Sequence, residues 1–221
     1  MLTDEKSEVF MKYDVIIIGA GPGGIFSAFE LTKKNPDLKV AVFEAGNTLD
    51  KRKCPIDGEK IKSCINCKNC SIMSGFGGAG AFSDGKYNIT NDFGGTLYEY
   101  IGKKRALELM KYVDEINMNY GGENTKLYST AGTKFKKICM QNDLHLLDAS
   151  VRHLGTDINY IVLENLYKEL KDKVTFYFNQ PVLKLEVIED GYRVTANKEM
   201  TRRKYREGKI SPEIIKNGGF S

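Results

Sequence analysis

The sequence predicts an α/β fold that begins with a Rossmann-like βαβ unit. The apolar, β-branched segment 13–18 is followed directly by Gly19. This pattern is typical of a strand buried on both faces of a parallel sheet. A glycine-rich turn over 19–24 follows, and segment 25–32 has the apolar spacing of a helix that Pro36 stops. A second apolar strand over 39–44 completes the unit within about 30 residues, the length of one right-handed crossover.

The rest of the chain predicts an inserted α+β segment. Residues 45–95 carry few regular signals, and so long a connection is usually functional or disordered; its cysteines and glycines favour function. The last segment, 197–221, is polar and basic, and we interpret it as a poorly packed tail. Elsewhere, periodicity and turn signals predict helices over 105–119, 133–142 and 156–170, strands over 145–151 and 174–178, and a hairpin of 182–188 with 192–196.

Composition excludes several function classes. The 221 residues are 41% hydrophobic and 28% charged, as expected of a globular protein, and no apolar run is long enough to span a bilayer. Net charge is +4, but segment 198–216 holds seven Lys or Arg against three Glu, which leaves 26 basic and 26 acidic residues elsewhere. We therefore expect a cytoplasmic protein with neither nucleic-acid nor membrane partners; its oligomeric state stays open.

The turn after the first strand predicts a dinucleotide site. Gly19-x-Gly21-x-x-Gly24 opens a helix, and Glu44 ends the next strand. Gly19 permits the tight turn, Gly21 lets the backbone approach a pyrophosphate, Gly24 permits close helix packing, and Glu44 is expected to accept hydrogen bonds from a ribose. The carboxylate disfavours a 2′-phosphate and therefore NADP at this site. The position of the unit near the N-terminus, before a long glycine-rich connection, favours FAD over NAD.

Four of the five cysteines lie close together in the sequence. Cys54, Cys64, Cys67 and Cys70 include two C-x-x-C spacings, which let successive thiolates converge on one metal. The spacing resembles [4Fe–4S] ligation, but a structural zinc site and redox-active thiols stay open. Cys139 is interpreted as an ordinary core residue.

A second glycine-rich stretch spans 74–86 and keeps two aromatic residues. Such a loop suits close approach of the backbone to a flat or anionic ligand, and we expect Gly77, Gly78, Gly80 and Ser83 to contact the cofactor. The pattern G-x-S-x-G is absent from the sequence, which argues against a serine hydrolase.

Segments 14–24, 54–55 and 72–86, together with the three-cysteine run of Cys64, Cys67 and Cys70, resemble a family of poorly characterised bacterial and archaeal FAD-dependent dehydrogenases, and segment 152–157 is similar to another part of that family. The resemblance spans about residues 13–196. It implies a glutathione-reductase-like flavoprotein fold with FAD on the first βαβ unit and the 74–86 loop near the flavin. Members of that family are longer, so the chain resembles a truncated N-terminal part, with a partial FAD-binding domain over 1–196, its Cys-rich and Gly-rich insertion over 54–86, and the tail.

The two histidines are the remaining candidates for proton transfer. His145 lies between leucines, which favours a structural role, whereas His153 follows Arg152 near an expected helix start. We predict catalytic roles for His153 and Arg152 in an FAD-dependent oxidoreductase that acts on a small-molecule substrate or electron acceptor, with NAD(P)H as a candidate electron donor. A non-catalytic fragment that binds metal or nucleotide, and an NAD-binding module, remain alternatives.

Overall fold

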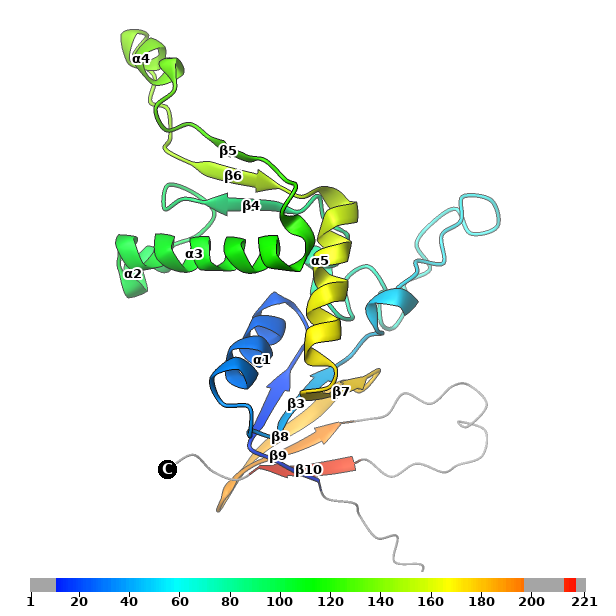
Figure 1. Cartoon of the computed structure of the whole chain (residues 1–221). Coiled ribbons are helices and arrows are strands. Elements are labelled where there is room, and N and C mark those ends of the chain that lie inside the picture. The colour runs from blue at the N-terminus through cyan, green and yellow to red at the C-terminus, as the bar shows by residue number, and fades with distance from the viewer. Residues whose placement is uncertain (1–10, 197–212, 218–221) are drawn as a thin grey trace, which may run out of the picture. The chain divides into compact units, whose positions relative to one another are not determined.

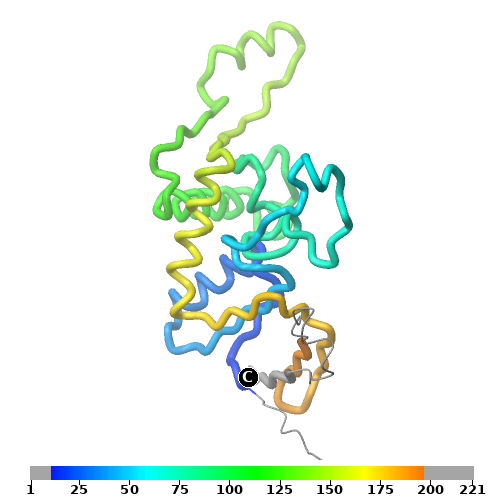
Figure 2. Tube along the Cα trace, turned by 90° about the vertical axis from the view of Figure 1, so that its right-hand side faces the viewer, coloured from blue at the N-terminus to red at the C-terminus, as the bar shows by residue number. Residues whose placement is uncertain are grey.

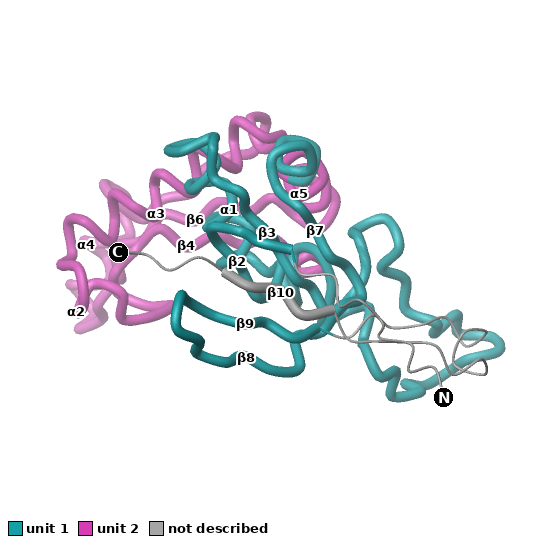
Figure 3. Tube along the Cα trace, turned by 90° about the horizontal axis from the view of Figure 1, so that it is seen from below, with its two compact units in different colours: residues 1–80, 167–221 teal, residues 81–166 magenta. Residues whose placement is uncertain are grey.

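The computed structural model describes residues 11–196 and 213–217, and the chain divides into two compact units. Unit 1 comprises residues 1–80 and 167–221, and unit 2 comprises residues 81–166 (Figure 3). Helix α5 (Gly155–Leu170) carries the chain from unit 2 into unit 1. Among the described residues, no helix is both long and apolar enough to cross a membrane.

The first sheet of unit 1 confirms the predicted α/β class. Its strands are β2 (Val15–Ile18), β3 (Val40–Glu44) and β7 (Val174–Phe178), in the order β2-β3-β7 and all parallel (Figure 1). Every residue of β3 is buried, because β3 lies between two neighbours. The expectation that the first strand is buried on both faces is wrong: β2 forms the edge of this sheet, and Ile18 is 54% exposed.

Helix α1 (Pro22–Lys34) connects the first two parallel strands. Proline at its first position is favourable, since its fixed φ suits a helix and its missing N–H would have no intrahelical partner. Ile25, Ala28 and Phe29 form the buried face, at the i, i+3, i+4 spacing that the sequence shows. The helix ends at Lys34 with Asn35 as its C-cap, directly before Pro36, which agrees with the predicted stop.

The second sheet of unit 1 contains the predicted hairpin. Its order is β1-β10-β9-β8, from β1 (Met11–Tyr13), β8 (Val182–Ile188), β9 (Gly191–Ala196) and β10 (Glu213–Asn217). β10 lies within the segment expected to be a tail, yet it pairs with both β1 and β9. The rest of that segment lies outside the described residues. Ala41 and Phe43 of β3 form a small core with Ala196 of β9.

Unit 2 combines helices with a three-stranded antiparallel sheet of order β4-β6-β5. From this unit an arm of residues 126–148, which includes β5 and α4, projects away from helix α3 (Figure 2). The elements β4, α2 and β5 carry no signal recognised in the sequence, and β6 lies later than the predicted strand 145–151. The bounds are β4 (Lys86–Ile89), α2 (Leu97–Ile101), α3 (Lys103–Asn117), a π-helical turn (Met118–Gly122), β5 (Leu127–Ser129), α4 (Lys134–Gln141) and β6 (Ser150–His153).

A buried ion pair joins strand β6 to helix α3. The guanidinium of Arg152 donates through Nε to Asp114 Oδ1 at 2.6 Å and through Nη2 to Asp114 Oδ2 at 2.8 Å, and Nη1 donates to the Thr125 carbonyl at 2.6 Å. Both side chains are 11% exposed. Removal of one partner would leave an uncompensated charge in the interior, which is far more costly than loss of an exposed pair.

We therefore predict that Arg152→Met lowers the free energy of unfolding of unit 2 by about 3–5 kcal/mol. Thermal and urea denaturation followed by circular dichroism measure the loss. Lys136→Met is the matched control, because its ion pair with Asp148 is exposed and contributes about 0–1 kcal/mol. Equal destabilisation by the two variants would contradict the role assigned to the Arg152–Asp114 pair.

Candidate functional site

The predicted dinucleotide loop lies at the carboxyl ends of β2 and β3. Gly19 has a φ of 97°, in the left-handed region that glycine adopts without strain, and its N–H donates to the Phe43 carbonyl at 2.7 Å. A Cβ built on Gly24 would lie 1.9 Å from the Gly19 carbonyl oxygen, so only glycine fits where the helix meets the turn. Open α/β sheets bind their ligands at this edge.

Glu44 fastens the surrounding loops to this edge of the sheet. Its Oε2 accepts a hydrogen bond from Ala20 N at 2.7 Å, and its Oε1 accepts from Gly46 N and Gly75 N, each at 2.8 Å. The residue is 6% exposed. These bonds satisfy most of the carboxylate, but Oε2 retains acceptor capacity for a further donor such as a ribose hydroxyl. The predicted ribose contact stays a prediction.

The second glycine-rich stretch closes on the first. Gly77 N donates to the Ala20 carbonyl at 2.8 Å, and a Cβ on Gly78 would lie 3.1 Å from the Gly21 Cα. The backbones therefore approach each other closely without side chains between them. Gly80 is in the same unit, in a 3-10 turn over 78–82, whereas Ser83 belongs to unit 2. Cofactor contacts by these glycines and by Ser83 stay predictions.

Arg52 holds the second glycine-rich stretch in place, a role the sequence does not reveal. Its guanidinium donates to four carbonyls, at 2.7 or 2.8 Å, and the residue is 4% exposed. Burial lowers the pKa of Arg52, while the nearby Glu44 and Cys70 act in the opposite direction. Arginine still keeps its charge in proteins. The acceptors are the carbonyls of Ser71, Ile72, Phe76 and Gly78.

Phe76 anchors the same stretch from its apolar side. It is fully buried and makes edge-on ring contacts with Tyr167, Phe176 and Phe178, at centroid distances of 5.1, 5.8 and 6.5 Å. Such pairs add to the energy of apolar burial. A buried arginine and a buried aromatic residue thus fix a loop that is otherwise almost free of large side chains.

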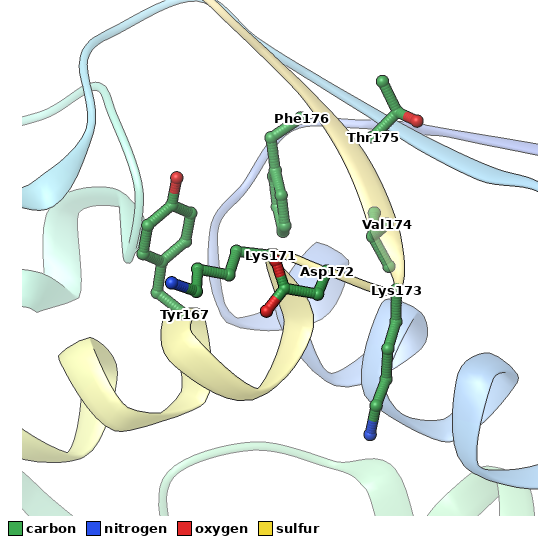
Figure 4. A pocket seen from close by; sticks show the side chains of 7 residues that line it. All are labelled: Tyr167, Lys171, Asp172, Lys173, Val174, Thr175 and Phe176. Atoms are coloured by element: carbon green, nitrogen blue, oxygen red, sulfur yellow. The ribbon is translucent and has the colours of Figure 1, made fainter.

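A cavity of about 410 Å³ lies at the opposite end of β7, where Lys171 to Phe176 enter the strand (Figure 4). Tyr167 also lines it, and burial together with Asp50 and Asp172 raises the pKa of this tyrosine. The lining is at the amino end of a parallel strand, away from the edge at which such sheets bind nucleotides. This cavity is therefore distinct from the dinucleotide loop.

The cysteine cluster is not assembled in the structure. Cys54, Cys64 and Cys67 are exposed and Cys70 is half-buried. In the part of the chain that the structure describes, no three His, Cys, Asp or Glu side chains lie close enough to hold a metal ion. The segment from 53 to 77, which carries the four thiols, contains no helix or strand. Cys139 is half-buried on α4 and not in a core, contrary to expectation.

The two residues predicted to be catalytic have different environments in unit 2. His153 is partly exposed, and its Nε2 lies 2.8 Å from Asp84 Oδ1, while Lys86 donates to Asp84 Oδ2 at 2.7 Å. The side-chain hydrogen bond from Lys86, and to a smaller extent the one from His153, lower the pKa of Asp84. Arg152 is instead committed to its buried pair with Asp114. The catalytic roles of both residues stay predictions.

The family match in sequence lies in the N-terminal part of the chain, and the matches to individual proteins are short. The Thi4 family matches residues 3–49. Thiamine thiazole synthase of Yarrowia lipolytica is 48% identical over 42 residues, which are 19% of this chain and 13% of that protein. An uncharacterized protein of Clostridium beijerinckii is 38% identical over 71 residues, or 32% of this chain and 13% of that protein. The Thi4 match thus covers little beyond the βαβ unit.

The fold is similar to that of a much longer enzyme. The crystal structure of 3-ketosteroid-Δ4-(5α)-dehydrogenase from Rhodococcus jostii, in complex with 4-androstene-3,17-dione, superposes with a TM-score of 0.54 at 12% identity. The superposition covers 97% of this chain and 46% of that enzyme. The fold class is thus α/β, with a Rossmann-like βαβ unit in a parallel sheet. The chain spans about half the length of this structural relative.

Neighbouring glycines of the loop provide a matched test of the site. Gly24→Ala places a methyl group 1.9 Å from a backbone oxygen, so we predict that it displaces the turn and weakens dinucleotide binding at least about tenfold. Gly23→Ala meets nothing within 4 Å and should bind normally, with a helix stabilised by up to about 1 kcal/mol. Fluorescence titration with FAD compares the two. Similar affinities would show that Gly24 does not shape the site.

The hydrogen bonds from Arg52 to the second glycine-rich stretch predict that this residue protects the stretch from local opening. Arg52→Ala leaves four carbonyls without this donor, through one buried and three part-buried hydrogen bonds. Loss of the donor at the buried Phe76 carbonyl alone costs about 1–3 kcal/mol. Hydrogen–deuterium exchange over residues 71–78 should therefore speed up at least about tenfold. Arg52→Lys should restore little of this protection, because an ammonium cannot reproduce the planar fork. Lys53→Ala, at an exposed neighbouring position, is the control. Unchanged exchange in Arg52→Ala would show that Arg52 does not hold the second glycine-rich stretch in place.

Proposed function

We propose that this chain binds FAD where its two glycine-rich loops meet, as the cofactor-binding part of an FAD-dependent oxidoreductase. One observation carries the proposal: the Glu44 carboxylate ties the first loop, the end of β3 and the second loop together through three backbone N–H groups. The matching Thi4 family segment and the fold shared with a steroid dehydrogenase support it. The substrate is a small molecule of unspecified class.

The residues present suit a dinucleotide. The first turn of α1 points its N–H groups at the loop, and by helix geometry Gly23 and Gly24 have no carbonyl four residues back inside the helix. Those groups, with the positive end of the helix dipole, would hold the pyrophosphate. The close backbone approach of Gly21 and Gly78 leaves no side chain in the way. The Glu44 carboxylate would accept a hydrogen bond from a ribose hydroxyl, and its negative charge would disfavour a 2′-phosphate at this position.

Bound FAD would supply the redox chemistry, with the protein setting its orientation and potential. His153 would then be the group that gives or takes a proton, and it would do so at Nδ1, because Asp84 occupies Nε2 and holds the ring while Lys86 holds Asp84. NAD(P)H as the electron donor, like the small-molecule substrate, remains part of the proposal.

An iron–sulfur cluster or zinc ion at Cys54, Cys64, Cys67 and Cys70 is a separate part of the proposal. The C-x-x-C spacings support it, as do the surrounding lysines, which would offset the charge of four thiolates. The arrangement of these side chains does not support it, since no ligand set is formed among the described residues. Iron and zinc analysis of anaerobically purified protein decides between a metal centre and free thiols.

Reconstitution with FAD tests the proposed function. The protein should show flavin absorbance bands after gel filtration and release stoichiometric FAD on denaturation. Glu44→Gln removes the charge and one set of acceptors, so its FAD affinity should fall about tenfold to a hundredfold, given about 1.5–3 kcal/mol for a hydrogen bond to a charged group. Glu30→Gln makes the same change of charge on the same unit, at a carboxylate that pairs with the exposed Lys34, and is the control.

Three results would contradict the proposal. The first is a chain that binds no FAD at 100-fold excess, and the second is one that binds NAD in preference to FAD. The third is Glu44→Gln with unchanged affinity, which would mean that the loops hold the nucleotide without the carboxylate. Circular dichroism of each variant ensures that a lost cofactor is not a lost fold.

A further inference from the structure

The arm of unit 2, residues 126–148, exposes a concentration of apolar side chains. Helix α4 lies on this arm, which projects from the rest of unit 2 in both views, and none of its residues is buried (Figures 1 and 2). Scattered single apolar residues are normal on protein surfaces, but a contiguous set marks an interaction site. The exposed large apolar residues of the arm are Leu127, Tyr128, Phe135, Ile138, Met140, Leu144 and Leu147.

Helix α4 carries an apolar face flanked by basic side chains. Phe135, Ile138 and Cys139 follow the i, i+3, i+4 spacing of one helix face, with Phe135 58% and Ile138 47% exposed. Lys134 and Lys137, three residues apart, flank this apolar face, and the Lys134 ammonium lies over the Phe135 ring, 5.8 Å from its centroid. The helix contains no acidic residue. A short helix with an apolar face flanked by basic side chains is typical of segments that lie in a membrane interface.

The charge of the whole arm narrows the choice of partner. It carries four lysines against Asp143 and Asp148, and Asp148 is paired with Lys136. A second copy of this chain would bring the same excess of positive charge against it, which is unfavourable. An anionic surface instead gains from every lysine within reach. Helix α4 has eight residues, so it can lie on a bilayer and cannot cross one.

We propose that the arm docks on the surface of an anionic lipid bilayer, with Phe135 and Ile138 inserted among the acyl chains and Lys134 and Lys137 at the phosphates of the headgroups. This goes beyond the proposed function, because it assigns a site of attachment and not a reaction. The sequence predicts no membrane partner because it lacks a span, but surface attachment requires none. Long lysine side chains reach outward to headgroups while their stems stay on apolar surface.

Vesicle flotation with the full chain tests the proposal. The protein should float with vesicles of phosphatidylcholine containing 30% phosphatidylserine, stay behind with pure phosphatidylcholine, and be released by 0.5 M salt, which screens the attraction. Lys134→Glu/Lys137→Glu should weaken partitioning at least about twentyfold, since each neutralised lysine is worth about a fivefold change. Phe135→Ser/Ile138→Ser should weaken it comparably by removing the inserted side chains.

Matched controls separate the arm from general surface effects. Lys60→Glu/Lys62→Glu makes the same change of charge at exposed positions of unit 1, and Leu183→Ser/Leu185→Ser removes two apolar side chains that are 61% and 54% exposed. Both should float like the parent chain. All of these positions are exposed or on the arm, so the fold should persist, and circular dichroism verifies it.

Three results would overturn the proposal. The first is a parent chain that fails to float with anionic vesicles, and the second is arm variants that float as well as the parent chain. The third is concentration-dependent dimerisation in light scattering that Phe135→Ser/Ile138→Ser abolishes, which would assign the apolar face to a second copy. Flavin binding is measured on the same samples, so loss of FAD and loss of lipid binding are told apart.

Discussion

The buried carboxylate of Glu44 determines how the carboxyl edge of the parallel sheet of unit 1 is built. The parallel register of β3 with β2 and β7 carries Glu44 to the end of the sheet. A carboxylate in such a position is costly unless it is hydrogen-bonded, and its donors come from three separate backbone positions. The loops must therefore close around it. Glycine at 46 and 75 follows from this closure, because a Cβ on either would lie 2.5 Å from another atom.

Opposite charges reinforce the same arrangement. Burial lowers the pKa of Arg52, and the attraction of the nearby Glu44 carboxylate opposes this decrease. The arginine binds carbonyl oxygens of the second loop while the glutamate binds N–H groups at the ends of both loops. Phe76 then fills the apolar side. A stretch with little side-chain volume is held by these three residues, which explains how it can be rich in glycine and still be ordered.

Features that depend on residues close together in the sequence can be predicted from it, whereas features that depend on distant residues cannot. The βαβ unit is predictable because turn, helix and strands each leave a signal within a few residues, and Gly24 does fit the position assigned to it. The role of Arg52 is not predictable, because its partners are main-chain carbonyls, which have no signature in the sequence. The edge position of β2 depends on strand order, and the place of β10 in a sheet depends on pairing with distant strands.

In unit 2, the adjacent residues Arg152 and His153 are both candidates for catalysis in the sequence, but they lie in different environments. Side chains alternate along a strand, so Arg152 and His153 of β6 point to opposite faces. Arg152 points inward to Asp114 and fixes β6 against α3, whereas His153 faces outward and lies opposite Lys86 in the register of β4 with β6. The buried pair therefore sets the position of the strand that presents His153 to Asp84. A structural arginine and a candidate for proton transfer are thus coupled through one strand, although they do not share a site.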